Sequence, residues 1–202
     1  RIADHPGLHL AAFSAADAAA EHRRLGEAGF PTLPLVDMRR PVGDNFARFS
    51  IARIAHGTMP EGRAQFLTHH SEPLVWLPDM LDHPNGAEAL TALWIAAADP
   101  AEVAARYARF TGRPAFPNGP MTTIDLARGR LIVMQPDFLK QTYGIEPAGK
   151  LPCFVAASVR VPSLSTVKKC LDASATDHRF CHRVLVVDLP AALGDALVFH
   201  TA

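Results

Sequence analysis

Apolar and polar positions along the chain repeat one arrangement three times. An apolar, strand-like run is followed by an acidic or serine cap and then by an alanine-rich stretch with helical spacing. The three copies open with the runs 7–13, 92–98 and 154–161. Self-similarity of this kind bears on architecture more directly than any single residue does. The pattern therefore predicts repeated strand–helix units, with any chemistry between units.

Local signals set the expected bounds of the first copy. A strand is predicted over 7–13, with Ser14 as the N-cap of a helix that ends at Gly29 before two prolines. Turn-forming residues then separate three further predicted strands, at 32–38, 45–54 and 63–70.

The other two copies are predicted in the same way. The second has a helix from Asp99 to Gly112, and the third has a helix over 162–172. Further strands are predicted at 121–126, 130–134, 183–188 and 196–200, and linkers at 71–88 and 137–150.

These elements predict an α+β fold. Consecutive strands joined by short turns are antiparallel by default, whereas a strand–helix–strand crossover allows parallel pairing. We expect curved mixed sheets with helices on the outside. The expected units are 1–82, 83–150 and 151–202, of which the last two pair as one domain.

Composition narrows the classes of partner. The chain has 202 residues with 20 basic and 20 acidic side chains, so no cationic surplus points to nucleic acid. No apolar run reaches the roughly 20 residues of a membrane-spanning helix, so no membrane partner is expected. Cys153, Cys170 and Cys181 form no C-x-x-C pair, and no signal-peptide layout is present. Reduced thiols and a cytoplasmic location are expected.

Several segments together resemble the vicinal oxygen chelate superfamily, in particular its glyoxalase-like branch (glyoxalase, bleomycin resistance and dioxygenase type). These segments are 66–76, with the sequence FLTHHSEPLVW, 83–87, with HPNGA, and the stretches 98–107 and 112–114. The resemblance implies βαβββ units that enclose a cupped pocket. Relatives of this type usually begin with another unit, so a further N-terminal unit is expected before Arg1.

The resemblance also implies a function. It suggests metal-dependent lyase, isomerase or dioxygenase chemistry on a small oxygenated substrate, with Zn, Fe, Ni or Mn as the divalent metal. A homodimer is compatible with it. Whether the chain is an enzyme stays open, because the same fold also serves as a non-catalytic protein that binds or sequesters a small molecule.

Histidines are the candidate metal ligands. The superfamily places ligands on the first and last strands of a unit, which points to His9 and to His69 or His70. Adjacent residues of a strand face opposite sides, so only one of that pair can enter a pocket. His9 with His70 is the preferred pair. His69 takes the place of His70 if the strand turns its other face to the pocket. The competing interpretation is that both histidines bond to backbone or water.

Two further side-chain groups are candidates. Glu72 follows the histidines and is a candidate ligand or general base, although a loop carboxylate is often only solvated. Arg48, Arg53, Arg128 and Arg130 alternate along strand-like stretches and could bind an anionic substrate, or could simply lie on an exposed sheet face.

Overall fold

A computed structural model describes residues 7–190 and 193–202. The chain divides into two compact units, of which one is Leu10–Leu81 and the other is Asp82–Ala202 together with residues 7–9. The two units are described separately below. The finer division at residues 82 and 150 stays a prediction.

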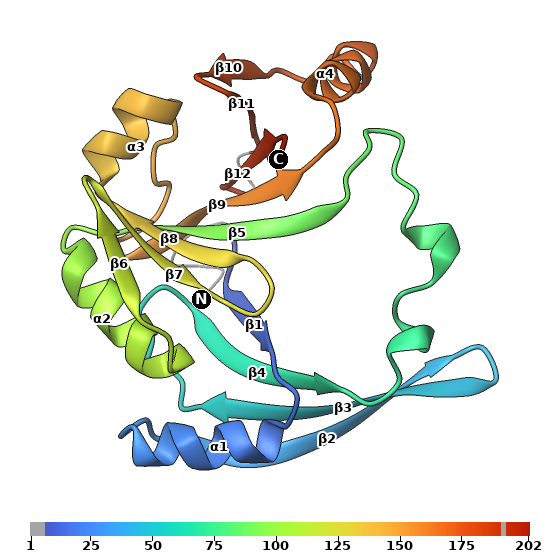
Figure 1. Ribbon diagram of the computed structural model, residues 1–202, viewed down its shortest axis with the longest axis vertical. Helices are drawn as coiled ribbons and strands as arrows, with labels where there is room; N and C mark the ends of the chain where they lie inside the picture. The colour runs from blue at the N-terminus through green and yellow to red at the C-terminus, as the bar shows by residue number, and fades with distance from the viewer. Residues whose placement is uncertain (1–6, 191–192) are drawn as a thin grey trace. The chain divides into compact units, whose positions relative to one another are not determined.

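The 10–81 unit is a four-stranded sheet with one α-helix (Figure 1). Its elements are β1 (Leu10–Ser14), α1 (Ala18–Glu27), β2 (Thr32–Val42), β3 (Asn45–Ile54) and β4 (Arg63–His69), then the short 3-10 helices η1 (Glu72–Leu74) and η2 (Pro78–Met80). The described strands lie in the order β1-β4-β3-β2. The β1–β4 pair is parallel and the other pairs are antiparallel.

The 82–202 unit contains one larger sheet. Its elements are β5 (Ala89–Ala96), α2 (Pro100–Thr111), β6 (Ala115–Asn118), β7 (Met121–Asp125), β8 (Arg130–Met134), α3 (Pro136–Tyr143), β9 (Cys153–Arg160), α4 (Leu164–Ala173), β10 (Arg179–Cys181), β11 (Val184–Asp188) and β12 (Ala196–His200). Among the described residues the sheet has eight strands, in the order β10-β11-β12-β9-β5-β8-β7-β6. The antiparallel pair β5–β9 lies at its centre.

One strand order and one parallel pairing recur three times. Each of the three segments runs strand, helix and then three strands, and its first and last strands pair in parallel, as β1–β4, β5–β8 and β9–β12. Just beyond each first strand, a backbone N–H donates to the last strand. These bonds are Ala15 to Leu67 (3.0 Å), Ala97 to Met134 (3.0 Å) and Val161 to His200 (2.9 Å). The α+β fold with mixed sheets is confirmed.

Helix caps explain where the three crossover helices begin. Each crossover helix has its N-cap two residues after the amide that bonds to the last strand. The N-cap side chains, which accept through oxygen, are Asp17, Asp99 and Ser163. Such a side chain accepts bonds from amides that have no partner inside the helix. The prediction of Ser14 as the first cap was wrong, because Ser14 is the last residue of β1.

One predicted linker is partly helical. Residues 137–150 were predicted to be irregular, but α3 begins at Pro136 and ends before Gly144, which is left-handed (φ 65°). Proline at the first helical position and glycine just past the end are typical helix boundaries. The short strands β6 and β10 were also missed.

The α-helices divide the large sheet into two faces. On the α4 side, Val161, Val167 and Leu185 belong to one apolar cluster. On the opposite face, α3 contributes Leu139 to a second cluster that includes Trp94. The Trp94 ring meets Tyr143 edge-on at 4.8 Å, and its Nε1–H donates to Ser158 Oγ at 2.7 Å. Helix α3 therefore fills this second face with apolar side chains.

Candidate functional site

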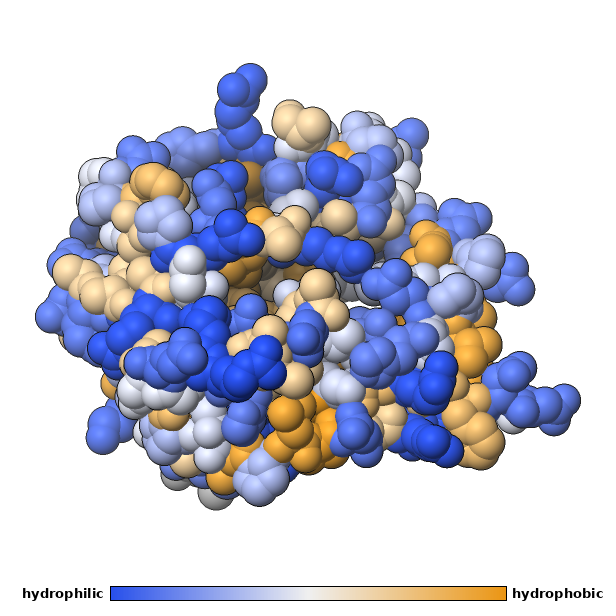
Figure 2. All heavy atoms as spheres, turned by 60° about the horizontal axis from the view of Figure 1, so that its bottom comes forward, coloured by the Kyte–Doolittle hydropathy of each residue, from blue (hydrophilic) through white to orange (hydrophobic). Residues whose placement is uncertain are grey.

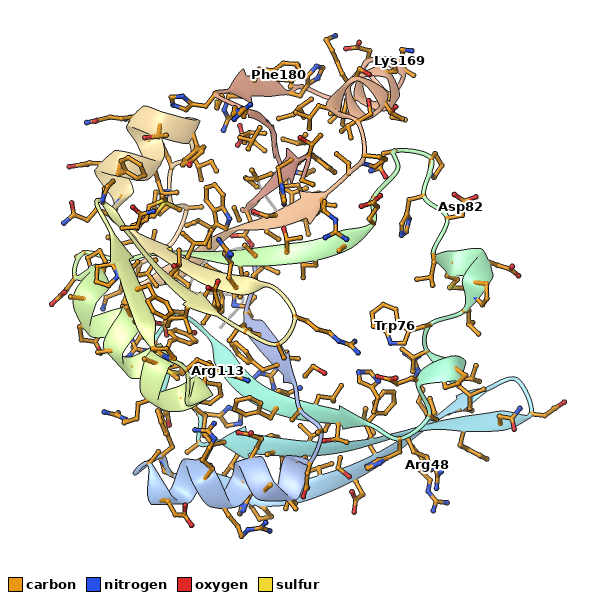
Figure 3. The ribbon with its side chains drawn as sticks, viewed as in Figure 1. Arg48, Trp76, Asp82, Arg113, Lys169 and Phe180 are labelled. Carbon is orange, nitrogen blue, oxygen red and sulfur yellow. The ribbon has the colours of Figure 1, made fainter. Side chains whose placement is uncertain are left out.

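His69 and His70 lie on opposite faces of the 10–81 sheet. The α1 face is identified by Phe66, which packs against Phe13 and lies under the guanidinium of Arg24 from α1. His70 has the same parity as Phe66, and His69 has the other. Arg48 belongs to the alternating set of β3 residues that face α1, and Figure 3 shows it pointing to that side. The face opposite α1, here called the open face, therefore carries His69.

His69 packs beside an apolar cluster. Its ring meets that of Phe49 nearly perpendicularly, with centroids 5.0 Å apart. Ala47, Phe49 and Ile51 form a buried cluster on this face. Partly buried apolar residues from the sheet and from the η1 segment pack against the cluster, namely Val36, Val42, Leu67, Leu74 and Val75.

One nitrogen of His69 is left without a partner. Its Nδ1 is buried and has no hydrogen-bond partner among the described residues. A buried polar atom without a partner loses its bond to water and gains nothing in exchange, which costs about 1–3 kcal/mol. A buried polar atom without a protein partner needs an explanation, and a hydrogen bond to an atom of a bound ligand would provide one.

Arg53 presents a similar feature on the same face. It lies on β3 two residues after Ile51 and opposite Gln65, so its side chain shares the face of Phe49. One terminal nitrogen donates to the Pro34 carbonyl at 3.3 Å, whereas the buried Nε has no partner within the described part of the chain. Arg48, five residues earlier, has the opposite parity, so these two arginines do not form one binding face.

His70 is engaged on the α1 face. Its Nε2 lies 2.7 Å from Ser50 Oγ, which in turn donates to Asp37 at 2.6 Å. Since that hydroxyl proton goes to the carboxylate, the imidazole N–H donates to the hydroxyl. His70 is thus part of a side-chain network on the face away from His69.

The remaining predicted residues are not gathered around His69. Glu72 begins η1 and is exposed, and its carbonyl accepts the amides of Val75 and Trp76. His9 was placed within the first strand, but β1 begins one residue later, at Leu10. Leu10 lies opposite Arg63, six residues before His69 on the parallel strand β4. Because a strand rises about 3.3 Å per residue, about 20 Å of β4 lies between those levels.

In the 82–202 unit, the sheet face that corresponds to the open face of the 10–81 sheet is apolar. Met134, Val198 and Trp94 lie there under α3, where the last strands could have carried polar ligands. At its edge, His200 Nε2 lies 2.7 Å from Thr91 Oγ1 and Nδ1 lies 2.8 Å from the Thr201 carbonyl. Both ring nitrogens of His200 are therefore occupied by structural contacts.

A separate cavity of about 520 Å³ lies in the 82–202 unit. Its lining combines apolar residues with Glu146, Asp188 and Asp195. Arg179 binds Asp188 in a bidentate pair, which raises the pKa of the guanidinium, and Asp195 accepts the amide of Leu8. Glu146 forms an ion pair with Lys140 at 3.0 Å, so all three carboxylates have structural partners.

A sequence comparison identifies the family. The family described as "Glyoxalase-like domain" matches residues 1–111, which is more than half of the chain. The chain belongs to this glyoxalase-like family. Among curated proteins, none matches the sequence significantly.

Solved structures agree on the fold of this glyoxalase-like chain. A hypothetical protein from Staphylococcus aureus superposes with a TM-score of 0.61 at 10% identity, covering 94% of this chain and 64% of its own. The chain therefore spans less than two thirds of that relative. A catechol 2,3-dioxygenase superposes with a TM-score of 0.59 at 11% identity, covering 98% of this chain and 69% of its own. At such identities the likeness shows the vicinal oxygen chelate fold alone.

The residues of the glyoxalase-like chain do not by themselves fit a metal. Across residues 7–190 and 193–202, no group of three or more His, Cys, Asp or Glu side chains is placed to hold an ion. His69 offers one open imidazole nitrogen, whereas His70 faces the other way. A protein metal site in this superfamily would need ligands in addition to these.

No helix in the described part of the chain is long and apolar enough to cross a membrane. Figure 2 shows one face of the molecule, where hydrophilic residues cover most of the surface and apolar ones form small separate groups.

Proposed function

We propose that this glyoxalase-like chain binds a small oxygenated molecule on the open face of the 10–81 sheet. The observation that carries the proposal is a pair of buried nitrogens, His69 Nδ1 and Arg53 Nε, that have no partner within the described residues and lie beside an apolar cluster. An apolar ligand body against the partly buried Leu67, Leu74 and Val75 would be held by burial of apolar surface, and its oxygens would accept hydrogen bonds from these nitrogens.

The chemistry of the two nitrogens sets the ligand class. Arg53 carries a permanent positive charge and favours a carboxylate or another anionic oxygen. His69 can donate to a ligand oxygen or accept from a hydroxyl, according to its tautomer. Trp76, 49% exposed, projects from the segment after η1 on the open-face side and could cover an aromatic ligand (Figure 3). An aromatic acid or a catechol has these features.

Thermal-shift measurements test the proposal. The chain is screened with benzoate-type acids, catechols and 2-oxo acids, with and without EDTA. A ligand at one hundred times its Kd stabilises by about 2.7 kcal/mol, which is a shift of several degrees in Tm. We expect His69→Phe and Arg53→Met to abolish the shift. The control His70→Gln, on the opposite face, should keep it.

Two results would count against binding on the open face. One is that no compound of these classes stabilises the chain. The other is that a stabilising compound acts equally on the wild type, His69→Phe and Arg53→Met.

A second candidate is metal-assisted chemistry on vicinal oxygens, as a lyase, isomerase or dioxygenase. The open Nδ1 of His69 favours it, because a neutral imidazole is a good ligand for Zn, Fe or Ni. The remaining ligands would have to come from elsewhere, because the other candidates of this chain, His9 and Glu72, are not gathered around His69. Elemental analysis of purified protein tests it. Less than about a tenth of an equivalent of metal, unchanged in His69→Ala, would contradict this candidate.

A further inference from the structure

The β2–β3 hairpin of the 10–81 sheet continues beyond the helix that covers the sheet. Helix α1 lies at the end remote from the turn, where His22 Nε2 is 3.0 Å from the Leu33 carbonyl oxygen. Figure 1 shows the turn end of the hairpin running on past the start of α1. The α1 face of the sheet is therefore left without a helix near the turn.

Four exposed side chains occupy this part of the α1 face. Arg48 belongs to that face, and Arg39 lies directly opposite it on β2. Phe46 is two residues before Arg48, and Pro41 lies directly opposite Phe46. Residues directly opposite each other on neighbouring strands share a face, as do residues two apart on one strand. We call Arg39, Pro41, Phe46 and Arg48 the hairpin patch.

The two arginines of the hairpin patch form a close cross-strand pair. The main-chain groups of Arg48 bond on the β4 side, since its N–H donates to Ser71 Oγ at 2.7 Å and its carbonyl accepts the His70 N–H at 2.9 Å. Arg39 and Arg48 are therefore a non-hydrogen-bonded pair, in which the side chains lie closer together than in the alternate pairs. Like charges directly opposite each other destabilise a sheet.

Among the described residues, no carboxylate pairs with either arginine. Neither guanidinium forms an ion pair or a side-chain hydrogen bond within residues 7–190 and 193–202. Asp37 lies in the adjacent pair on this face, where it accepts a hydrogen bond from the Ser50 hydroxyl at 2.6 Å. Its single charge leaves the group of Arg39, Arg48 and Asp37 with a net positive charge. Two neighbouring guanidinium groups without a counter-ion favour an anion from outside the chain.

The chemistry of the hairpin patch indicates the kind of anion. A guanidinium presents a planar fork of N–H donors that matches the oxygens of a phosphate or a carboxylate. A phosphate monoester has three free oxygens and up to two negative charges, so it matches two forks better than a carboxylate does. The adjoining pair, Pro41 and Phe46, is apolar, and Phe46 is 55% exposed. This pair offers a surface to an apolar or aromatic part of the same molecule.

We propose that Arg39 and Arg48 bind the phosphate group of a small phosphate ester whose apolar or aromatic part lies against Pro41 and Phe46. Binding replaces the repulsion between two like charges by charge-assisted hydrogen bonds from both guanidinium groups. The hairpin patch lies on the α1 face, whereas the ligand proposed above lies on the open face. The phosphate site therefore does not depend on the proposed function.

Isothermal titration calorimetry of the 202-residue chain with phenyl phosphate tests the site. In about 0.1 M salt, where the Debye length is about 10 Å, we expect Kd to rise about tenfold or more in Arg39→Gln and in Arg48→Gln, because each variant loses hydrogen bonds from a charged group to the phosphate. Arg40→Gln is the matched control. It removes the same charge one residue away, but its side chain lies on the open face, opposite Ala47, so Kd should stay within about twofold.

Two further probes separate the phosphate group from the apolar part. Phe46→Ser should weaken the binding of phenyl phosphate and leave the Kd of inorganic phosphate unchanged, because only the ester has a ring to place against Phe46. In Arg53→Met, which removes the proposed open-face site, benzoate should bind more weakly than phenyl phosphate, because it carries a carboxylate on the same ring. Equal affinities of these two probes in Arg53→Met would overturn the assignment to a phosphate.

The melting temperature of the ligand-free chain gives an independent readout. Arg39→Gln removes the repulsion with Arg48, so its Tm should rise by about 1–4 °C, which also shows that the variant is folded. A fall of several degrees would show that the protein itself holds Arg39 and would overturn the proposal.

Three binding results would also overturn it. One is that phenyl phosphate does not bind at concentrations up to about 10 mM. Another is an equal Kd in the wild type, Arg39→Gln and Arg48→Gln. The third is a loss of binding in Arg53→Met alone, which would assign phenyl phosphate to the open face.

Discussion

At the residue scale, parity along β4 decides which histidine can meet a ligand. The sequence established that His69 and His70 must face opposite sides, because strand side chains alternate. Only the packing of Phe66 under α1 assigned His70 to the helix side. The preference for His70 as the inward residue therefore gives way to His69 in our proposal. The role of either as a metal ligand stays a prediction.

Gly129 is held by both its conformation and its surroundings. It has φ +78°, and a Cβ at this position would lie 2.7 Å from the Thr91 carbonyl oxygen. Gly129→Ala should lower the free energy of unfolding by about 2 kcal/mol or more, since backbone must move. Urea denaturation measures this loss. Gly119→Ala is the control, because Gly119 has φ +58° with no neighbour within 4 Å, and it should lose about 1 kcal/mol. Equal losses would show that the close approach to Thr91 is not important.

Tyr143 gives the 82–202 unit a pH dependence at the alkaline end. Burial, with a smaller effect of Cys181, raises the pKa of Tyr143 above its ordinary value. The folded state therefore prefers the neutral phenol more than the unfolded state does. Its contribution to stability is complete below the unfolded pKa and is lost as pH rises through the folded pKa. Absorbance titration at alkaline pH should show a late-ionising tyrosine that is missing in Tyr143→Phe. An ionisation at the ordinary tyrosine pKa would contradict this.

At the element scale, α3 shows what caps and turns can and cannot reveal. Pro136 and Gly144 mark its ends clearly in the sequence, yet the segment was predicted as a linker. With only eight residues it offers little periodicity. Its burial of Leu139 against the β5 and β9 face is a tertiary fact that no local signal contains.

Removing the apolar contact of α3 should destabilise the 82–202 unit. Leu139 is fully buried, so Leu139→Ala should cost about 2–5 kcal/mol through the lost contacts and the cavity left behind. Near-ultraviolet circular dichroism should change as well, because Trp94 lies in the same cluster. Gln141→Ala, exposed on the same helix, is the matched control and should change stability by less than about 0.5 kcal/mol. A loss below about 1 kcal/mol in Leu139→Ala would show that α3 is not tightly packed.

At the scale of the whole molecule, the chain is two compact units. Leu25 of α1 is fully buried, and Leu185 belongs to the α4 side of the large sheet. We expect Leu25→Ala to speed amide hydrogen exchange in the 10–81 strands and Leu185→Ala to speed it in β11 and β12. Local unfolding of separate cooperative units is the reason. Uniform acceleration across both units in either variant would show that they unfold as one.

The membership of the chain in the glyoxalase-like family limits its function to a fold-level class. Proteins of one fold carry out unrelated reactions, because the reaction depends on the site residues. Our proposal places an oxygenated molecule at the residues gathered on the open face, His69 and Arg53 beside an apolar cluster.

The sequence by itself determined the repeated elements of this protein. Caps such as Asp99, the Gly112 stop and the strand alternation act within a few residues, so the sequence could predict most helices and strands. The tertiary structure decided everything that depends on register between distant strands. It set Leu10 against Arg63 and thereby moved His9 away from His69, it turned His69 to the open face, and it left β1 at an edge. These outcomes come from long-range packing and main-chain pairing, which no local pattern specifies.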